Sequence, residues 1–585
     1  MRAGNFPGGI GITSGWLLCV TRRNGRWFVT ISAILPNSRA GSLAHIRNKR
    51  NYRNQGFDRM PLVGSESVGM TSPSPRSGHS TGLPERLFPW ALGSCVFLDY
   101  FDNSMFSFFA GHIAGGVHAS PDELVLAFSA YAVASVLGIL QQQWWVERLG
   151  YRRYISGCVL LFALASVACC FTESSAELAF ARGVAGYFMG PMLSACRILI
   201  QVSFSPQERS PATRKFLSLI LFESALAPLA GGYFVAQSGW QALFAATSLA
   251  SCGVAAFAFL AIPSSGKKPV EEHGENHFWP YIIFALAFSA LQIAMQQVRF
   301  EVFSASPDLI LLTLGGLAAL VWFVQHQWRH PRPLMQLQVL KERTFQVGML
   351  MYAFYYYISN ALGFLLSRFL EGGLGYPVEN GGRVVGLAAL ASLPMCFIYF
   401  RYSARVASKK WIVVCGYLVA LSLCLWMMRL PPDASTPWLV PALLMRGSLL
   451  LTMALPVANV AFSIFALETY NHGYRFKNIV KQLTYSFSTA TTIILQQHRN
   501  ALHYDRLIEP VNPLNPAYQS AMETLSQSFE AMGHSPEESH GLAIAEMSQW
   551  VISQAAFLSA QDGFAFLALI ALCGLVLGLW QRQIR

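Results

Sequence analysis

The sequence has few charged residues for its length. Charged side chains make up 12% of the 585 residues, whereas apolar side chains make up 53%, and the mean hydropathy is positive at +0.39. Soluble globular domains usually carry about 25% charged residues. The composition therefore excludes an ordinary soluble domain and predicts a chain that crosses a membrane several times.

The eleven cysteines form no pattern that suggests disulfide bonds. Ten of them lie in or at the edges of long apolar segments, and Cys19 lies in the polar N-terminal region. Cys169 and Cys170 are adjacent, and adjacent side chains on a helix point apart. Since the long polar segments offer no pair to bridge, we predict no disulfide framework.

The motifs of most enzyme sites are also missing. The sequence shows no His/Asp metal set, no glycine-rich loop that would cradle a phosphate and no nucleophile motif. His503, His534 and His540 lack the spacing of metal ligands. We therefore predict no metal, no cofactor and no enzymatic activity. An integral membrane lipid or sugar transferase is the alternative, and it would need such groups clustered at a membrane interface.

Long apolar runs dominate the chain after residue 87. Each has roughly 19 to 27 residues, the length with which an α-helix crosses about 30 Å of hydrocarbon at about 1.5 Å per residue. They predict an all-α polytopic membrane protein with fourteen spans. The runs cover residues 88–112, 124–144, 154–172, 178–203, 214–237, 240–262, 278–297, 308–326, 344–367, 382–400, 410–429, 438–464, 477–497 and 562–581.

The loops between these runs alternate in charge. One side holds twenty Lys and Arg, whereas the other holds five, with Arg383 ambiguous at a span edge. Cytoplasmic loops carry the excess of basic residues, so we predict a multi-pass plasma (inner) membrane protein with both termini in the cytoplasm. The basic side holds Arg148, Arg152, Arg153, Arg209, Arg214, Lys215, Lys267, Lys268, Arg329, Arg332, Lys341, Arg343, Arg401, Arg405, Lys409, Lys410, Arg475, Lys477, Arg582 and Arg585; the other holds Arg299, Arg368, Arg429, Arg499 and Arg506.

The net charge of +12 resides mostly in the N-terminal 86 residues, which hold twelve Lys and Arg against three acids. A basic protein can bind nucleic acid, but only +3 is left for the remainder of the chain, so we predict no nucleic-acid partner. Residues 1–86 lack helical or strand periodicity and are predicted to be a disordered cytoplasmic tail. A start at Met60 or Met70 is an alternative, as is contact of the tail with anionic lipid headgroups.

Charged residues inside the spans are few, and each costs several kcal/mol unless it faces a cavity or a partner. Asp99 and Asp102 lie three residues apart on one helix face, so both cannot easily be ionised. A proton-coupled carrier needs such acids, although one of them could simply pair with an arginine. The basic residues at depth are Arg182, Arg197, Arg446 and Lys481.

Glu223 is the third deep carboxylate, and no basic residue lies within a helical turn of it. An unpaired buried acid is expected to hold a proton, so it could exchange that proton, bind a cationic substrate or bond a neighbouring carbonyl. Arg182 and Arg446 each begin an Arg-Gly pair shortly after the start of an inward-running span. Their matched placement suggests two related halves.

These residues occur in segments that resemble the fourteen-span drug:proton antiporter branch of the major facilitator superfamily, the EmrB and QacA type, over residues 88–585. Residues 102–115 (DNSMFSFFAGHIAG) resemble its first-span motif, with Asp102 at the acidic position. Residues 144–153 (WWVERLGYRR) resemble its gating loop. The matching loop positions are Glu147, Arg148, Gly150, Arg152 and Arg153.

Four further segments carry the resemblance. Arg182 and Gly186 fit the fourth-span motif whose arginine is linked to proton transfer, together with Gly190 and Pro191. Residues 481–487 and 554–564 resemble patterns around the last two spans. The fifth-span antiporter motif is matched by Pro228, Gly231 and Gly232.

The sequence departs from the family pattern at several positions. Gln143 replaces the glycine that opens the loop motif, Gly111 replaces a first-span proline, and Ala227 replaces the glycine before Pro228. Larger side chains at close helix contacts alter packing. The resemblance therefore implies the fold but not the substrate of any relative.

The resemblance implies two six-helix bundles, residues 87–263 and 344–585, joined by two extra spans and a cytoplasmic connector in residues 264–343. Between Asp505 and Glu546, the long outer loop 498–561 holds six Glu and one Asp against only Arg506. It is either a solvated cap or a docking surface for a periplasmic adaptor that would lead to an outer-membrane channel.

The implied function is proton-coupled export of small amphiphilic molecules by alternating access. Asp102 would carry the proton, with Asp99 or Glu223 sharing this role and Arg182 tuning the acid. The proton gradient would be the energy source. The expected cavity residues are Phe106, Phe108, Tyr355, Tyr356, Tyr357, Arg446 and Lys481. An uptake symporter or a metabolite or siderophore carrier on the same scaffold is the alternative.

Overall fold

The computed structural model divides the chain into two units, residues 1–77 and 78–585. The described residues are 16–23, 26–33, 83–264, 278–297, 307–330, 333–406, 408–465 and 467–584.

The first unit contains a two-stranded antiparallel hairpin. Strand β1 (Trp16–Arg23) pairs with β2 (Arg26–Ala33), with Trp16 opposite Ala33 and Arg23 opposite Arg26. Aromatic and β-branched residues favour strands, and Asn-Gly between them is typical of a two-residue hairpin. The prediction of a tail without regular structure is therefore wrong for these strands, and the rest of residues 1–82 lies outside the described residues.

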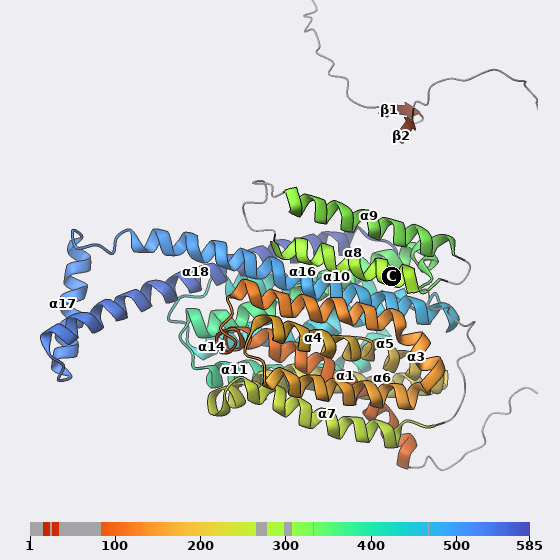
Figure 1. Ribbon diagram of the computed structural model, residues 1–585, viewed down its shortest axis with the longest axis horizontal. Coiled ribbons are helices and arrows are strands. Elements are labelled where there is room, and N and C mark those ends of the chain that lie inside the picture. Colours follow the sequence, from red (N-terminus) through yellow and green to blue (C-terminus); the bar gives the residue numbers. More distant parts are fainter. Residues whose placement is uncertain are drawn as a thin grey trace, which may run out of the picture. The chain divides into compact units, whose positions relative to one another are not determined.

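The second unit begins with seven helices that form one half of a helical bundle (Figure 1). Capping boxes at Ser120 and Ser205 begin two of them, where each serine and the glutamate three residues later satisfy exposed backbone N–H groups. The helices are α1 (Leu83–Phe108), α2 (Ala110–Gly116), α3 (Pro121–Cys170), α4 (Ser175–Met189), α5 (Met192–Ser203), α6 (Pro206–Ser238) and α7 (Gln241–Ala261).

Two helices, α8 (Phe278–Gln297) and α9 (Pro307–Arg329), pack against each other along one side of the bundle (Figure 1). Gln292 of α8 donates to Ser129 of α3 at 2.8 Å and also to Ser486, which lies in the other half. The extra pair of helices is thus bonded to both halves. A short helix, η1 (Leu337–Lys341), follows them.

The second half contains several spans that are broken or locally widened. Proline and π-turns interrupt the regular helical bonding, and neighbouring helices must then satisfy the freed backbone groups. Its elements are α10 (Arg343–Arg368), η2 (Phe369–Gly373), α11 (Val378–Leu390), α12 (Ser392–Tyr402), η3 (Ser403–Arg405), α13 (Lys409–Met427), α14 (Thr436–Leu449), η4 (Leu450–Ala454), α15 (Leu455–Ala461), α16 (Leu467–Ile508), α17 (Pro516–Ala531) and α18 (Pro536–Trp580).

Within the described residues, ten helices are long and apolar enough to cross a membrane. One of them, α3, holds two predicted spans, because Gly150 leaves the helical conformation at φ +73° between them. The other three predicted spans lie in α1, α8 and α16. This arrangement is consistent with fourteen spans and establishes a multi-pass membrane protein with an all-α bundle.

Helix α16 begins earlier than predicted. Arg475 and Lys477 were expected in a basic loop, but both lie within this helix and are buried. That part of the loop assignment is wrong, because the helix continues beyond its apolar run with polar residues that face the protein interior and not lipid.

Helices α16, α17 and α18 extend beyond the other helices at one end of the bundle (Figure 1). Asp562 links α18 to α16 within this projection. It accepts hydrogen bonds from Arg499 at 2.6 Å and from His503 at 2.7 Å, both on α16. Met522 of α17 is buried beside α18.

The two halves meet closely along α6 and α11. A Cβ atom on Gly382 would lie 2.3 Å from the carbonyl oxygen of Pro228, and one on Gly231 would lie 2.1 Å from the Phe109 ring. No side chain fits at either distance without displacement of a helix or ring. Pro228 and Gly232 of the antiporter motif therefore lie where the backbones of α6 and α11 approach, whereas Gly231 packs against the Phe109 ring within the first half.

We expect Gly382→Val to separate these helices and to lower the free energy of unfolding by about 1–3 kcal/mol, the usual cost of overpacking. Thermal unfolding of the purified protein in detergent measures this. Gly157→Val is the matched control, because no atom lies within 4 Å of the position that its Cβ would occupy. Equal melting temperatures for the two variants would contradict the packing argument.

Candidate functional site

Two acidic side chains of α1 are buried at the centre of the second unit, and each has its own cationic partner. Asp102 accepts from the guanidinium of Arg182, on α4, at 2.5 Å. Both side chains are almost completely excluded from solvent, with exposed fractions of 2% and 1%. Because α1 and α4 belong to the same half, this ion pair lies within one half of the bundle.

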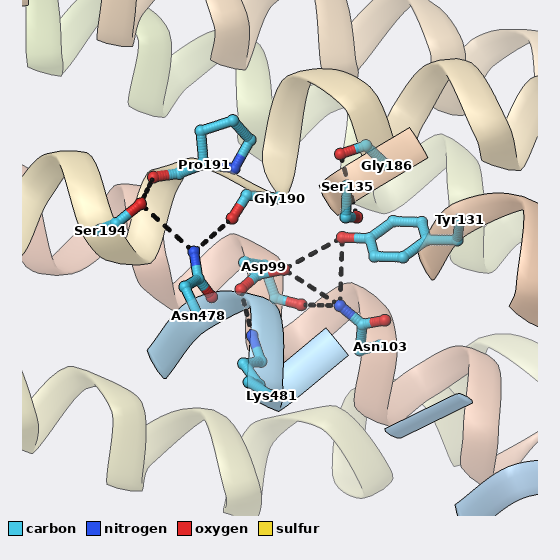
Figure 2. A network of polar contacts seen from close by, with 10 residues as sticks. All are labelled: Asp99, Asn103, Tyr131, Ser135, Gly186, Gly190, Pro191, Ser194, Asn478 and Lys481. Carbon is cyan, nitrogen blue, oxygen red and sulfur yellow. Dashed lines mark hydrogen bonds and ion pairs between the residues drawn. The ribbon is translucent and has the colours of Figure 1, made fainter. Parts of the chain in front are cut away.

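The second pair joins the two halves. The Nζ atom of Lys481, on α16, lies 2.6 Å from Asp99 Oδ2. The other carboxylate oxygen of Asp99 accepts from Tyr131 at 3.0 Å and from Asn103 at 3.1 Å. Figure 2 shows these groups converging on Asp99 from α1, α3 and α16. A motion that separates the halves at this level must therefore break the Asp99–Lys481 pair.

Tyr131 connects the two ion pairs. Its hydroxyl bonds Asp99 and accepts from Asn103 at 3.1 Å, while the guanidinium of Arg182 lies 4.4 Å from the centre of its ring. Arg182 also lies 4.3 Å from the ring centre of Phe106. These contacts form a continuous chain from Asp102 to Lys481, so a change of charge at one acid is felt at the other.

A break between α4 and α5 supplies a further contact across the halves. Pro191 lacks a backbone N–H and ends the regular helix at Gly190. Asn478 of α16 donates to the carbonyl of Gly190 at 2.8 Å and to Ser194 at 3.3 Å (Figure 2). Asn478 lies three residues before Lys481, so one face of α16 makes both contacts.

A central cavity of about 110 Å³ lies beside this network and has room for several water molecules. Glu223 and Arg446 line it from opposite halves, together with Phe108 and Tyr355. Glu223 is 3% exposed, and its Oε1 atom has no hydrogen-bond partner among the described residues. An incompletely bonded buried carboxyl group is thus available to a molecule in the cavity.

A second cavity, of about 550 Å³, shares Ser107 and Phe108 with the first. It extends to Glu371 and Asn500, at the same end of the spans as the α17 projection. Beside it, His112 of α2 lies 2.9 Å from Glu371, and Ser367 donates to the carbonyl of Phe108. Phe108 therefore lines both cavities.

The structure does not bring all the predicted cavity residues to the lining. Lys481 is held by Asp99, and Phe106 packs edge-on against Phe128 at 4.6 Å and beneath Arg182. Tyr356 is buried among Tyr352, Tyr355 and Tyr485. These three predicted residues do not line the cavity, nor does Tyr357, whereas Phe108, Tyr355 and Arg446 do.

The predicted gating loop forms the turn between the two spans of α3. Glu147 accepts from Gln143 at 2.9 Å, the guanidinium of Arg148 lies 3.6 Å from the Trp144 ring centre, and that of Arg152 lies 4.1 Å from the Phe259 ring centre. Arg153 is exposed and Gly150 makes the turn. The charged side chains thus lie around a tight turn, supported by aromatic rings.

Tyr131, Asn103 and Asn478 were missed by sequence reasoning, which considered only charged residues at depth. A signal was present in α16, where polar side chains recur every three or four residues through a membrane span and face the protein interior. The buried polar residues of α16 are Asn471, Arg475, Lys477, Asn478, Lys481, Gln482, Ser486, Ser488, Thr489, Thr492 and Gln496.

Within the part of the chain that the structure describes, no group of three or more His, Cys, Asp or Glu side chains is placed to hold a metal ion. The ten described cysteines are free, and they run from Cys95 to Cys573. The chemistry available at the site is therefore that of carboxylates, basic side chains and hydroxyl groups.

Residues 92–488 match the model of the Major Facilitator Superfamily. The chain is 21% identical over 488 residues to the multidrug export protein EmrB of Escherichia coli (strain K12), which covers 83% of this chain and 93% of that protein. It is 19% identical to the fatty acid resistance protein FarB of Neisseria gonorrhoeae, over 75% of this chain and 86% of that protein.

Solved transporter structures share the fold. A bacterial homologue of the human lysosomal transporter Spinster, in an inward-facing conformation, superposes with a TM-score of 0.54 at 14% identity, covering 86% of this chain and 98% of that one. A D-xylose-proton symporter superposes with a TM-score of 0.51 at 13% identity, covering 83% and 97%. At these identities the likeness concerns the fold alone.

Proposed function

Because the chain belongs to the major facilitator superfamily, a family of transporters, we propose that it is a proton-coupled exporter of small amphiphilic molecules. The curated relatives support this proposal, since two that match over more than four fifths of this chain carry the name multidrug export protein. Four charged residues at depth, Asp99, Asp102, Arg182 and Lys481, form two neighbouring buried ion pairs, which supports the same proposal.

The observation that carries the proposal is the pair of buried acids on α1 with partners of different kinds. Asp102 is paired within one half, whereas Asp99 is paired across the halves, and Tyr131 links them. Asp102, which takes up the proton, is thereby connected to the Asp99–Lys481 contact, which must break when the halves move. Proton coupling requires that connection.

The cycle that we propose starts with the halves apart on the outer side. A proton on Asp102 cancels its charge and weakens its attraction for Arg182, and the cargo leaves. After the halves reorient, cargo entering from the inner side favours the ionised acid, and the proton leaves to the cytoplasm. Glu223, at the cavity wall, shares the proton or contacts the cargo.

We further propose that the shared wall at Phe108 separates the central cavity from the exit path. The second cavity lies beyond it, next to the contact between His112 and Glu371 that joins α2 to the other half. Opening of this contact would connect the two spaces. The direction of the path favours release at the end that carries α17.

The proposed location is the inner membrane, with both termini in the cytoplasm and the α17 projection in the periplasm. The alternation of basic loops supports this orientation. The projection exposes apolar side chains, among them Leu514 at 92% and Met532 at 72%. We propose that it contacts a periplasmic adaptor connected to an outer-membrane channel.

Transport by the purified protein in liposomes tests the function. With an imposed pH gradient, we expect ethidium to move against its own gradient while protons move the opposite way, and nigericin to stop both. Cargo and protons moving in the same direction would instead establish a symporter. No movement of either in response to the gradient would contradict proton coupling.

A further inference from the structure

A further ion pair joins the two halves, at the end of the spans that carries α17. The Nε2 atom of His112, on α2, lies 2.9 Å from Glu371 Oε2, on η2. The side chains of this pair are 38% and 23% exposed, whereas those of Asp102 and Arg182 are 2% and 1% exposed. Solvent therefore reaches the His112–Glu371 pair, and histidine is the side chain that ordinarily changes charge between about pH 5 and 8.

Both partners lie beside interruptions of a helix. Helix α1 ends at Phe108 and α2 begins at Ala110, and the carbonyl of Phe108 accepts a hydrogen bond from Ser367 in the other half. Glu371 lies in the π-turn η2, between α10 and α11. Such π-turns occur frequently at functional sites. Because α2 and η2 are short and interrupt longer helices, the pair can separate without unfolding of a whole span.

The negative charge of Glu371 depends on His112 for its balance. The other carboxylate oxygen, Oε1, lies 3.2 Å from the Ser367 hydroxyl, but the single proton of that hydroxyl also reaches the Phe108 carbonyl. Arg368 of α10 acts on Glu371 only at longer range, because the two form no ion pair in the described part of the chain. A partly buried carboxylate is less stable when its cationic partner becomes neutral. Neutral His112 therefore favours separation, in which water hydrates Glu371.

Other carboxylates on the helices that pack against α2 and η2 have partners of their own. They are Asp99 and Asp102 of α1, Glu123 of α3, Glu379 of α11 and Asp562 of α18, which bond Lys481, Arg182, the backbone N–H of Ser120, Arg383 and Arg499, respectively. Among the described residues, Glu371 is the charged group that acts on the imidazole of His112. The charge of His112 is thus read out mainly at Glu371, across the two halves.

We propose that His112 and Glu371 form a pH-sensitive latch of the outer gate, so that protons on the α17 side favour the closed gate. This inference rests on the proposed function, because it assigns a control to one step of that cycle. A protonated imidazole forms a charge-assisted bond with a carboxylate, so the closed state binds this proton more tightly than the open state. By linkage, acid on that side shifts the equilibrium toward closure. In the cycle above, the same acid loads Asp102, so the carrier that closes outward is the one that holds the proton and has released its cargo.

Hydrogen–deuterium exchange of the full-length protein in phosphatidylcholine nanodiscs tests the latch without cargo and without a gradient. Backbone exchange in residues 109–118 and 369–378, corrected for the intrinsic effect of pH on amide exchange, reports opening of the gate. We expect the corrected exchange of the wild type to be about threefold to tenfold slower at about pH 5.5 than at about pH 7.5, because His112 is charged at the lower pH.

Substitutions that fix the charge should remove this pH dependence. His112→Gln keeps a hydrogen-bonding group but no charge, so its corrected exchange should be fast at both pH values, and Glu371→Gln should match it. His112→Lys is charged at both pH values and should exchange slowly at both. His540→Gln is the matched control, since His540 is an exposed histidine of α18, in the projection at the same end, and it should behave as the wild type does.

Exchange within α13, which takes no part in the latch, should be equal in all variants and reports that they are folded. A pH effect of equal size in the wild type and in His112→Gln would overturn the proposal and assign the effect to another group, such as His503 beside Asp562. The absence of any corrected pH effect in the wild type would overturn it as well. Because the experiment contains neither cargo nor a gradient, failure of the latch is distinguishable from failure of proton-coupled export, which the liposome assay measures.

Discussion

Asp102→Asn is expected to abolish export driven by a pH gradient while the protein still binds and exchanges its cargo. The amide keeps the size of the side chain and a bond to Arg182 but cannot take up and release a proton. Asp102 is buried and paired with Arg182 at 2.5 Å. An acid at the protein surface therefore cannot take over the proton transfer of Asp102. We expect a loss of at least about a hundredfold in gradient-driven transport, an estimate of the order found for removal of a proton-transfer group.

The measurement compares two assays in the same proteoliposomes. Gradient-driven efflux should vanish, whereas exchange of labelled for unlabelled cargo, which needs no net proton movement, should continue. Asp308→Asn is the matched control, because Asp308 is an exposed acid near the start of α9. Retention of gradient-driven export by Asp102→Asn would rule out this acid as the coupling group.

Lys481→Met is expected to destabilise the protein strongly, and Asp99→Asn in the same chain is expected to restore most of the loss. Both side chains are fully buried and lie 2.6 Å apart. Removing one partner leaves an uncompensated buried charge, which costs about 3–5 kcal/mol, whereas removing both is nearly neutral. Thermal unfolding of the single and double variants in detergent gives the comparison.

The Asp99–Lys481 pair joins α1 to α16. The double variant that lacks both charges should therefore also move more easily between conformations. We expect faster exchange of cargo than in the wild type together with poor coupling to the gradient. The matched control is Glu379→Gln with Arg383→Met, which removes a partly exposed pair within α11 and should cost less than about 1 kcal/mol. If the effects of Lys481→Met and Asp99→Asn simply added, the ion pair would not be the energetic link.

The fold could be predicted well from the sequence because the membrane imposes simple rules. Runs of about twenty apolar residues must be helices, and the spans appear where they were expected from α1 to α18. The start of α16 could not be predicted in this way. In the sequence, Arg475 and Lys477 are basic residues at the start of an apolar run, which is typical of a loop. Only the packing of α16 against neighbouring helices shows that they are buried.

The site was predictable in its charged members but not in its pairing. Depth in a span identified Asp99, Asp102, Arg182 and Lys481, because charges inside a membrane need partners. Their partners could not be assigned, since Asp99 and Lys481 are separated by 382 positions and meet only through the arrangement of the two halves. Neutral members of the network, such as Tyr131, carry no comparable signal in a sequence rich in aromatic residues.

Proton release on cargo binding tests the central claim most directly. Purified protein in weakly buffered detergent solution, with a pH-sensitive dye, should release up to about one proton for each cargo molecule bound, over the pH range in which the empty protein holds that proton. Asp102→Asn should bind the cargo and release none. Equal proton release from the wild type and from Asp102→Asn, at equal occupancy by cargo, would contradict the account.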